Sequence, residues 1–485
     1  MQGRFLKILG AVTVINIVAR LLGFAREVII GYQYGTTYHA DSIITAFTIP
    51  NFIYIVIGGA ITTAFISVYS KLSKAIKDEF VQTIFTGLSV IVGILTILFM
   101  IFPEFWIQLF FSGMTEEALS LTSELFVWMA PATLFLALSM GLSGLHNVHD
   151  NFRLTSFSTF IFNAVFLVVG VGLTPYMMEY SYGLGASLGA FLMFAILIYY
   201  IWKQRIAPLR FKFVKLPETK RFLKLALPIV FGGATVQFYF IIQRIYAANL
   251  NEGVISSLNY ASKMTQFPQA VLMTSVTTII YPLLAKAVGE KDFAKVKNAY
   301  KKGFRMLTLI LLPATIFIFI YAKEIITFIF EYGDFDVSST NRTYPLLQLF
   351  SLSILGLAVN TYITRFFYAM ENAYLPIILN VISVFGVNIF VISVLIEKLG
   401  ASAIALGTVI GTFVNMILLI IVATTKLKLI VSNWGYIIKL LLFLLITTGF
   451  IWLSSIIAVS YIIISLCIGG IVTLLMVLGG LKVVR

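Results

Sequence analysis

Four basic residues lie inside apolar stretches that are long enough to cross a bilayer. They are Arg20 and Arg26 in the first stretch, Arg244 in the seventh and Lys263 in the eighth. A charge at mid-membrane costs about 2.5–3.5 kcal/mol on insertion scales, so such residues usually serve a function. We expect these cations to line a water-filled cavity between two lobes, where they attract an anion. Snorkelling or a structural ion pair is the alternative, above all for Arg26 and Arg244.

An internal repeat relates some of these residues. A shift of 218 positions places Arg26 on Arg244 and Pro50 on Pro268. A proline inside a helix removes a backbone hydrogen bond and produces a kink. We expect hinges at Pro50 and Pro268, with pliancy from nearby glycines, although kinking without motion explains the prolines as well. The glycines are Gly23, Gly58 and Gly59.

Acidic and polar residues accompany the cations. Glu27 follows Arg20 by seven residues and shares nearly the same helix face, and Asp41 opens the second stretch. We expect both carboxylates to offset the cations while no anion is bound, with Asn51 as a further polar neighbour. Asp41 could equally cap the second helix at its amino terminus.

The composition identifies an integral membrane protein. The chain is 60% hydrophobic and 11% charged, with a mean hydropathy of +1.00, whereas a soluble domain carries about 25% charged residues. We count fourteen apolar stretches, and only helices satisfy the backbone in such stretches. The predicted fold is therefore an all-α bundle of about fourteen transmembrane helices.

Most of the 34 basic residues fall in alternate loops and in both tails. The exceptions outside the apolar stretches are Lys323, Arg342 and Lys398. By the positive-inside rule, both termini lie in the cytoplasm. The net charge of +14 therefore reflects membrane topology. Nucleic-acid binding is excluded, because no folded domain is available for it.

The repeat and the loops suggest a plan of six, six and two helices. The predicted parts are an N-terminal lobe over 1–203, a basic cytoplasmic linker over 204–221, a C-terminal lobe over 222–425 and two added helices over 426–485. Because each lobe has an even number of helices, a pseudo-two-fold axis along the membrane normal should relate the lobes.

No pattern of residues indicates catalysis. Cys467 is the one cysteine, and the histidines His39, His146 and His149 form no metal-binding cluster with cysteines or carboxylates. A GxxxxGK loop for phosphates is absent from the sequence. We therefore expect a protein that is not an enzyme and needs no metal or cofactor.

Several of the basic, acidic and proline residues named above lie in motifs that resemble the MurJ/MviN family of lipid II flippases, part of a superfamily that includes drug antiporters. The strongest motif is ARLLGFARE at residues 19–27, followed by Tyr34-Gly35, Ala40-Asp41 and FTIPN at residues 47–51. Further matches are Phe267-Pro268, FEYGDF at residues 330–335 and Phe367-Tyr368-Ala369. The resemblance extends over most of the chain.

The resemblance implies two lobes that open alternately to either side of the bacterial cytoplasmic membrane. The substrate would be lipid II, an undecaprenyl-pyrophosphate-linked sugar, moved from the inner to the outer leaflet by a monomer. The family's cavity arginines map onto Arg20 and Arg26, and its acidic residue onto Asp41. Tyr54 and Lys263 occupy positions where the family has arginines. Wall-synthesis proteins would be partners, and the last two helices would form a groove for the lipid tail.

Other functions fit parts of this pattern. A flippase for another polyprenyl-pyrophosphate saccharide, such as a capsule or exopolysaccharide unit, would need the same cations. A drug/cation antiporter would favour an acidic cavity, whereas the residues within these stretches are mostly basic. A scaffold without transport activity is the remaining alternative.

Overall fold

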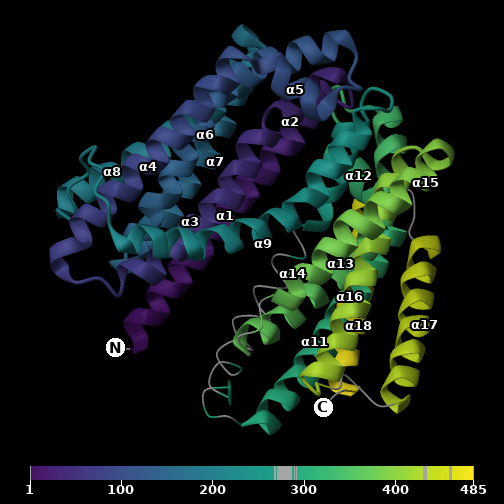
Figure 1. Ribbon diagram of the computed structural model, residues 1–485. Coiled ribbons are helices and arrows are strands. Elements are labelled where there is room, and N and C mark those ends of the chain that lie inside the picture. The colour runs from purple at the N-terminus through teal and green to yellow at the C-terminus, as the bar shows by residue number, and fades with distance from the viewer. Residues whose placement is uncertain are drawn as a thin grey trace. The chain divides into compact units, whose positions relative to one another are not determined.

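The computed structural model describes residues 2–266, 269, 284, 287, 288, 290, 292–370, 372, 374–429, 434–457 and 461–483. Within these residues all regular structure is helical, which confirms the predicted all-α membrane fold (Figure 1). The chain divides into two compact units. Unit 1 comprises Met1–Ile30 and Thr37–Ile255, and unit 2 comprises Gly31–Thr36 and Ser256–Arg485.

Unit 1 contains nine helices within the described residues, counting α1, whose last turn belongs to unit 2. Helix α6 packs on α3, α4 and α8, while α9 packs on α3. The helices are α1 (Gln2–Tyr34), α2 (Tyr38–Ala46), α3 (Thr48–Tyr69), α4 (Lys74–Ile101), α5 (Pro103–Phe111), α6 (Glu116–Val148), α7 (Phe152–Met177), α8 (Tyr180–Gln204) and α9 (Pro217–Ala247).

Unit 2 is built around α13, which packs on α11, α12 and α16. A π-helix, η1, interrupts the span that follows α13. The elements are α11 (Phe293–Ile320), α12 (Ala322–Phe330), α13 (Val337–Ala369), α14 (Tyr374–Val381), η1 (Ile382–Asn388), α15 (Ile389–Leu399), α16 (Ala401–Lys426), α17 (Trp434–Ile457) and α18 (Ile462–Val483).

Eleven spans of the described chain are long and apolar enough to cross a membrane, and α9 makes a twelfth if its two bent parts count as one. The other predicted spans are α1, which contains three charged residues in its second half, and the stretch over 255–285, most of which lies outside the described residues. The multi-span architecture is thus confirmed. The count of fourteen and the pseudo-two-fold axis stay predictions.

Helix α9 joins unit 1, whereas the repeat in the sequence places its residues at the start of a C-terminal lobe. The helix bends by 48° between Pro217–Gly232 and Gln237–Ala247 (Figure 1). Pro228 and the pair Gly232-Gly233 lie at or before this bend and account for it, because proline removes a hydrogen bond and glycine adds freedom. The two compact units therefore begin and end at different residues from the predicted lobes, which stay a prediction.

Small residues bring α7 and α8 close together. Gly185 and Gly189 on α8 are four residues apart, as in a GxxxG motif. A Cβ atom at Gly185 would lie 2.8 Å from the Phe166 carbonyl oxygen, and one at Gly189 would lie 2.8 Å from the Phe162 carbonyl oxygen. The motif thus fixes the position of α7 and of the side chain of Phe166, which is 1% exposed.

The start of α13 depends on one carboxylate. Asp336 is the N-cap residue, and its Oδ1 accepts a hydrogen bond of 2.7 Å from the Ser339 backbone N–H. This hydrogen bond lowers the pKa of the Asp336 carboxyl. The Asp336 carboxyl thus has a lower pKa in the folded protein than in the unfolded chain. The cap therefore stabilises the fold fully at pH values above the unfolded pKa of about 3.9. That contribution is lost as pH falls through the folded pKa.

Replacing the Asp336 cap should lower the stability of unit 2 by a measurable amount. We expect Asp336→Ala to destabilise unit 2 by about 1 kcal/mol at neutral pH, and the difference from the natural chain should shrink at acidic pH. Asp336→Ser, which keeps a capping oxygen without a titrating group, serves as the control. Thermal unfolding of the purified protein at several pH values measures both effects. An Asp336→Ala deficit that persists unchanged in acid would contradict this role.

Candidate functional site

Arg26 and Glu27 form a buried ion pair on α1. Arg26 Nη2 lies 2.9 Å from Glu27 Oε1, and the two side chains are only 11% and 7% exposed. A buried charge without a partner is costly, whereas an adjacent opposite charge offsets much of that cost. The pair therefore allows α1 to keep a cation inside its apolar second half.

Two aromatic rings support the Arg26 guanidinium. Its carbon lies 4.1 Å from the centre of the Phe166 ring and 5.5 Å from that of Phe47. The two rings contact each other edge to face at 5.1 Å. Cation–π contacts of this kind are worth about 0.5–2 kcal/mol. Arg26 is thus fixed by α7 and by the α2–α3 junction as well as by Glu27.

The α2–α3 junction is an interruption in the second span. Helix α2 ends at Ala46, and α3 begins at Thr48, with Phe47 between them in a turn. Pro50 explains this break, because it has no N–H to donate to the Ala46 carbonyl four residues earlier. Phe47 and Thr48 lie at this interruption and contact Arg26 and Arg244, and the hinge predicted at Pro50 stays a prediction.

Arg244 reaches the same junction from α9. Its Nη1 donates a hydrogen bond of 2.7 Å to Thr48 Oγ1, and Thr48 in turn donates to the Ile44 carbonyl at 3.0 Å. The Arg244 guanidinium also interacts electrostatically with Glu27. Arg26 and Arg244, which are 218 positions apart and correspond in the repeat, therefore converge on one junction. We call Arg26, Glu27, Thr48 and Arg244 the junction cluster.

The junction cluster carries a net positive charge, because two guanidinium groups share one carboxylate. Arginine presents planar pairs of N–H donors that match the oxygens of phosphates and carboxylates. In a medium of low dielectric constant, the unbalanced charge attracts an anion more strongly than it would in water. The charge and the donors of the junction cluster would suit a phosphate-containing group, and the binding role predicted for its residues stays a prediction.

Other predicted site residues lie apart from this cluster. Arg20 is exposed on the surface of α1, and no hydrogen bond or ion pair among the described residues involves it. Lys263 is half-buried in unit 2 and Asn51 is half-buried in α3. Pro268 lies outside the described residues. The roles given to these four residues stay predictions.

The predicted hinge glycines occupy different environments. A Cβ atom at Gly58 would lie 2.5 Å from Met140 Cγ on α6, and one at Gly23 would lie 3.1 Å from Asn163 Oδ1 on α7. Gly59 has open space around it, and α3 continues unbroken through both of its glycines. Gly58 and Gly23 therefore permit close helix packing in this structure, and their action as hinges stays a prediction.

Asp41 does not cap α2, which corrects one of the two expectations for this residue. The N-cap is Thr37, and Asp41 lies in the first turn. Its buried Oδ2 accepts a hydrogen bond of 2.8 Å from the Gly253 backbone N–H, in the loop after α9. That loop also contains Glu252. Its Oε1 accepts a hydrogen bond of 2.7 Å from the backbone N–H of Tyr38, the first residue of α2. Glu252 thus satisfies an unpaired N–H at the start of α2.

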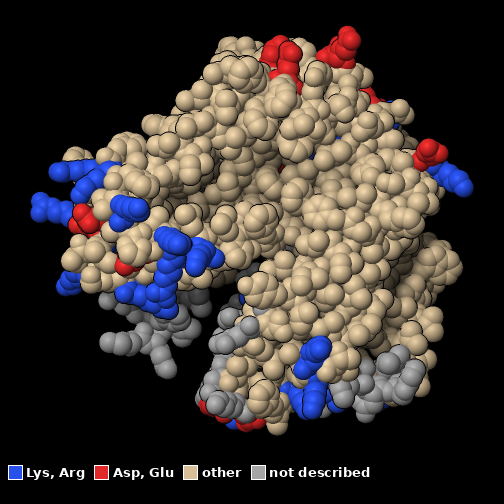
Figure 2. All heavy atoms as spheres, viewed as in Figure 1, with Lys and Arg blue, Asp and Glu red and all other residues tan. Residues whose placement is uncertain are grey.

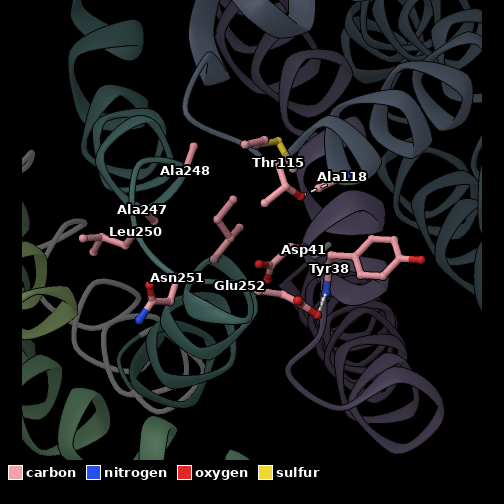
Figure 3. Close-up of a pocket in the computed structure, with 11 residues that line it drawn as sticks. Tyr38, Asp41, Thr115, Ala118, Ala247, Ala248, Leu250, Asn251 and Glu252 are labelled. Carbon is pink, nitrogen blue, oxygen red and sulfur yellow. Dashed lines mark hydrogen bonds between the residues drawn. The ribbon is translucent and has the colours of Figure 1, made fainter.

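Asp41 and Glu252 line a small pocket at this end of unit 1 (Figure 3). The space open to water is about 20 Å³, and one water molecule needs roughly 10–15 Å³ by the same measure. The pocket has room for about one water molecule. Its lining residues are Tyr38, Asp41, Met114, Thr115, Ala118, Ala247, Ala248, Leu250, Asn251, Glu252 and Ile255.

This geometry makes a prediction for Asp41. Asp41→Ala would leave the Gly253 N–H without its acceptor, at a cost of about 1–3 kcal/mol. Asp41→Asn keeps an oxygen acceptor, so it should retain most of the stability. Thermal unfolding of the two variants measures the difference. Equal unfolding temperatures for Asp41→Ala and the natural chain would show that the hydrogen bond to Gly253 contributes nothing.

No individual role follows from the sequence for Phe47 and Thr48, although both lie in the FTIPN motif, or for Phe166 and Glu252. Phe47 and Thr48 directly precede the Ile49-Pro50 pair, so their position next to a predicted kink was a usable signal. Phe166 carries no such signal, because its role depends on the packing of α7. Among the described residues, no group of three or more histidine, cysteine or acidic side chains is arranged to hold a metal ion.

The fold is similar to that of solved membrane transporters. The structure is similar over 98% of this chain and 99% of the other to "Lipid II flippase MurJ, inward closed conformation", with a TM-score of 0.85 and 24% identity. It is also similar to a multidrug resistance MATE transporter of the MOP superfamily in an inward-facing conformation. That likeness has a TM-score of 0.72 and 14% identity, and covers 84% of this chain and 94% of the transporter.

The chain belongs to the MurJ family, described as "Lipid II flippase MurJ", which matches residues 30–472. The lipid II flippase MurJ of Burkholderia cenocepacia is 25% identical over 423 residues, covering 83% of this chain and 81% of that protein. The probable lipid II flippase MurJ of Rhizobium meliloti is 28% identical over 440 residues, covering 87% of this chain and 80% of that protein. The resemblance found in the motifs is confirmed.

Proposed function

We propose that this protein is a lipid II flippase, which moves the lipid-linked peptidoglycan precursor from the inner to the outer leaflet of the cytoplasmic membrane. Membership of the MurJ family over residues 30–472 is the observation that carries the proposal. The junction cluster supports it, because a cationic site inside a span suits the diphosphate of such a lipid. Alternating access is the mechanism that we propose for the movement.

The chemistry of the substrate explains what the residues must do. The sugar and diphosphate cannot enter hydrocarbon unaided, whereas the prenyl tail need not leave it. Arg26 and Arg244 would bind the diphosphate through charge-assisted hydrogen bonds. Glu27 would keep the two arginines compensated when no substrate is bound, so that the site is stable in both states. No covalent bond changes in this process, and the protein acts as a transporter rather than an enzyme.

Other predicted residues have supporting roles in this proposal. Arg20 and Lys263 would extend the cationic surface for the diphosphate, with Asn51 as a polar neighbour. The spans α17 and α18, which are almost wholly apolar, would form the groove for the prenyl tail. Both termini would lie in the cytoplasm, and the protein would act as a monomer that meets wall-synthesis proteins.

A second candidate is a flippase for another polyprenyl-pyrophosphate saccharide. Tyr54 favours it, because a tyrosine stands where the family typically has an arginine. The Tyr54 ring lies 6.3 Å from that of Phe162, so the side chain packs among aromatic residues of α7. A drug/cation antiporter is disfavoured, because the junction cluster has a net positive charge.

Complementation in bacteria depleted of their own lipid II flippase tests the proposal. We expect expression of this protein to restore growth and to make the precursor accessible on the outer face of the membrane. Restored export of a capsule or exopolysaccharide unit, without restored growth, would instead support the second candidate. Failure of a stably inserted protein in both assays would overturn the assignment as a lipid-linked saccharide flippase.

A further inference from the structure

The connection between α8 and α9 is an extended segment fastened to α4. We call residues 206–216 the basic strap. Thr83 and Thr86 of α4 each take part in two hydrogen bonds with its backbone. The Val214 N–H donates to Thr83 Oγ1 at 3.1 Å, and the Lys212 N–H donates to Thr86 Oγ1 at 3.0 Å. The threonine hydroxyls lie within 3.4 Å of the Val214 carbonyl and 3.2 Å of the Lys212 carbonyl. The strap therefore has a defined position on unit 1.

Aromatic and basic residues alternate along the basic strap. Its central sequence is Arg210-Phe211-Lys212-Phe213-Val214-Lys215. Lys212 is tied to α4 by an ion pair of 3.0 Å with Glu79. Phe211 and Phe213 are 75% and 70% exposed, although the Phe211 ring also lies 5.9 Å from that of Phe85 on α4. This exposure indicates that something outside the chain covers them.

The depth of the strap indicates a membrane. Thr83 and Thr86 lie in α4, and the exposed side chains Ile91 and Ile94 on the same helix begin five residues later. At 1.5 Å per residue, this distance is about 8 Å, so the strap lies where α4 enters hydrocarbon. Trp202 at the end of α8 is 80% exposed, as is common for tryptophan in the interfacial layer.

The charge around the strap identifies the lipid class. Residues 203–224 contain eight basic residues and one acidic residue, Glu218. In Figure 2, basic side chains of unit 1 gather at the end where α8 ends and α9 begins. Clusters of lysine and arginine next to a membrane span attract anionic headgroups. Zwitterionic lipids lack the net charge needed to benefit from such a cluster.

We propose that the basic strap is a binding site for anionic phospholipid in the cytoplasmic leaflet. Arg210 and Lys215 contact the headgroup phosphates, while Phe211 and Phe213 insert among the first acyl carbons. Because the strap leads directly into Pro217, bound lipid also fixes the start of α9, the helix that carries Arg244. This inference is independent of the substrate that the protein transports.

A site-specific measurement tests the proposal. Trp202 is kept as the one tryptophan of the full-length chain by replacing Trp106, Trp128, Trp434 and Trp452 with phenylalanine. The protein is reconstituted in phosphatidylcholine with increasing fractions of brominated phosphatidylglycerol or brominated phosphatidylcholine, and quenching of Trp202 gives a relative binding constant. We expect clear preference for phosphatidylglycerol, which Arg210→Gln with Lys215→Gln should reduce by about 10-fold or more.

Three comparisons make the result decisive. Lys297→Gln with Lys302→Gln removes the same charge from exposed positions of α11 and should leave the preference unchanged. Phe211→Ser with Phe213→Ser should weaken quenching by both lipids. Added salt should reduce the preference of the natural strap. Equal quenching by the two lipids, or a preference that survives Arg210→Gln with Lys215→Gln, would overturn the proposal. So would displacement of the preference by an oligonucleotide, which would indicate a soluble polyanion instead.

Discussion

Arg26→Ala is expected to reduce precursor translocation by about 100-fold. One charge-assisted hydrogen bond contributes about 1.5–3 kcal/mol, which corresponds to roughly 10- to 150-fold in binding. Arg26→Lys keeps the charge but loses the planar pair of donors, so its defect should be smaller. Accessibility of the precursor on the outer membrane face, in cells depleted of their own flippase, measures the effect. Arg153→Ala, which removes an exposed arginine at the start of α7, is the matched control.

A second substitution separates folding from substrate binding. Arg26→Ala alone removes the 2.9 Å ion pair with Glu27 and the ring contacts of the guanidinium, so some stability will be lost. Arg244 still interacts with Glu27 in this variant, which leaves the cluster without a net charge. Arg26→Ala with Glu27→Gln restores a net charge of +1 through Arg244 but not the Arg26 donors, so transport should stay low in protein that is inserted normally. Normal transport by this double variant would exclude Arg26 as a ligand of the diphosphate.

Much of the junction cluster could be predicted because its signals are local. A cation in an apolar span, a proline in the next span and their repetition 218 residues later are all visible in the printed sequence. These signals pointed to Arg26, Arg244 and Pro50, and the structure brings Arg26 and Arg244 to the interruption that Pro50 causes. Their transport roles stay predictions, whereas their proximity is a property of the fold.

The contacts that hold the cluster could not be predicted in the same way. Phe166 is one of 43 phenylalanines. Its ring contacts the Arg26 guanidinium only because of the way α7 packs against α8. The expectation that Asp41 could cap α2 was wrong because the helix starts four residues earlier, after Thr37. Asp41 instead accepts a hydrogen bond from Gly253, which is 212 residues away in the sequence. Pairings over such distances are set by tertiary structure, and local propensity contains no information about them.

The motifs Tyr34-Gly35 and FEYGDF contact each other through their backbones within unit 2. Gly35 has φ of +55° and Gly333 has φ of +62°, a region that favours glycine. The Asp334 N–H donates to the Tyr32 carbonyl at 2.9 Å. A Cβ atom at Gly35 would lie 2.4 Å from the Asp334 carbonyl oxygen, and one at Gly333 would lie 2.3 Å from that of Tyr32. Two backbone segments of the chain thus meet at a place where neither segment has room for a side chain.

Gly35→Ala is therefore expected to prevent unit 2 from forming stably. The left-handed conformation alone costs about 1–2 kcal/mol for alanine, and contact with a backbone oxygen cannot be relieved by moving a side chain. Gly400 is a control for a positive φ without a contact, because its φ is +51° and its ψ is −128°, and nothing lies within 4 Å of its Cβ position. Gly400→Ala should lose only the conformational term, and Gly59→Ala, in open space inside α3, should be neutral or stabilising.

Asparagine separates the two costs at Gly35. This residue tolerates a left-handed backbone better than alanine does, so a purely conformational cost would make Gly35→Asn milder than Gly35→Ala. Gly35→Asn should instead remain as damaging as Gly35→Ala, because its Cβ meets the same oxygen of Asp334. Yield of monodisperse protein and its unfolding temperature measure all four variants. If Gly35→Asn unfolds at a clearly higher temperature than Gly35→Ala, the backbone contact between the two motifs adds no constraint, and the pairing of Gly35 with Asp334 must be looser than the geometry indicates.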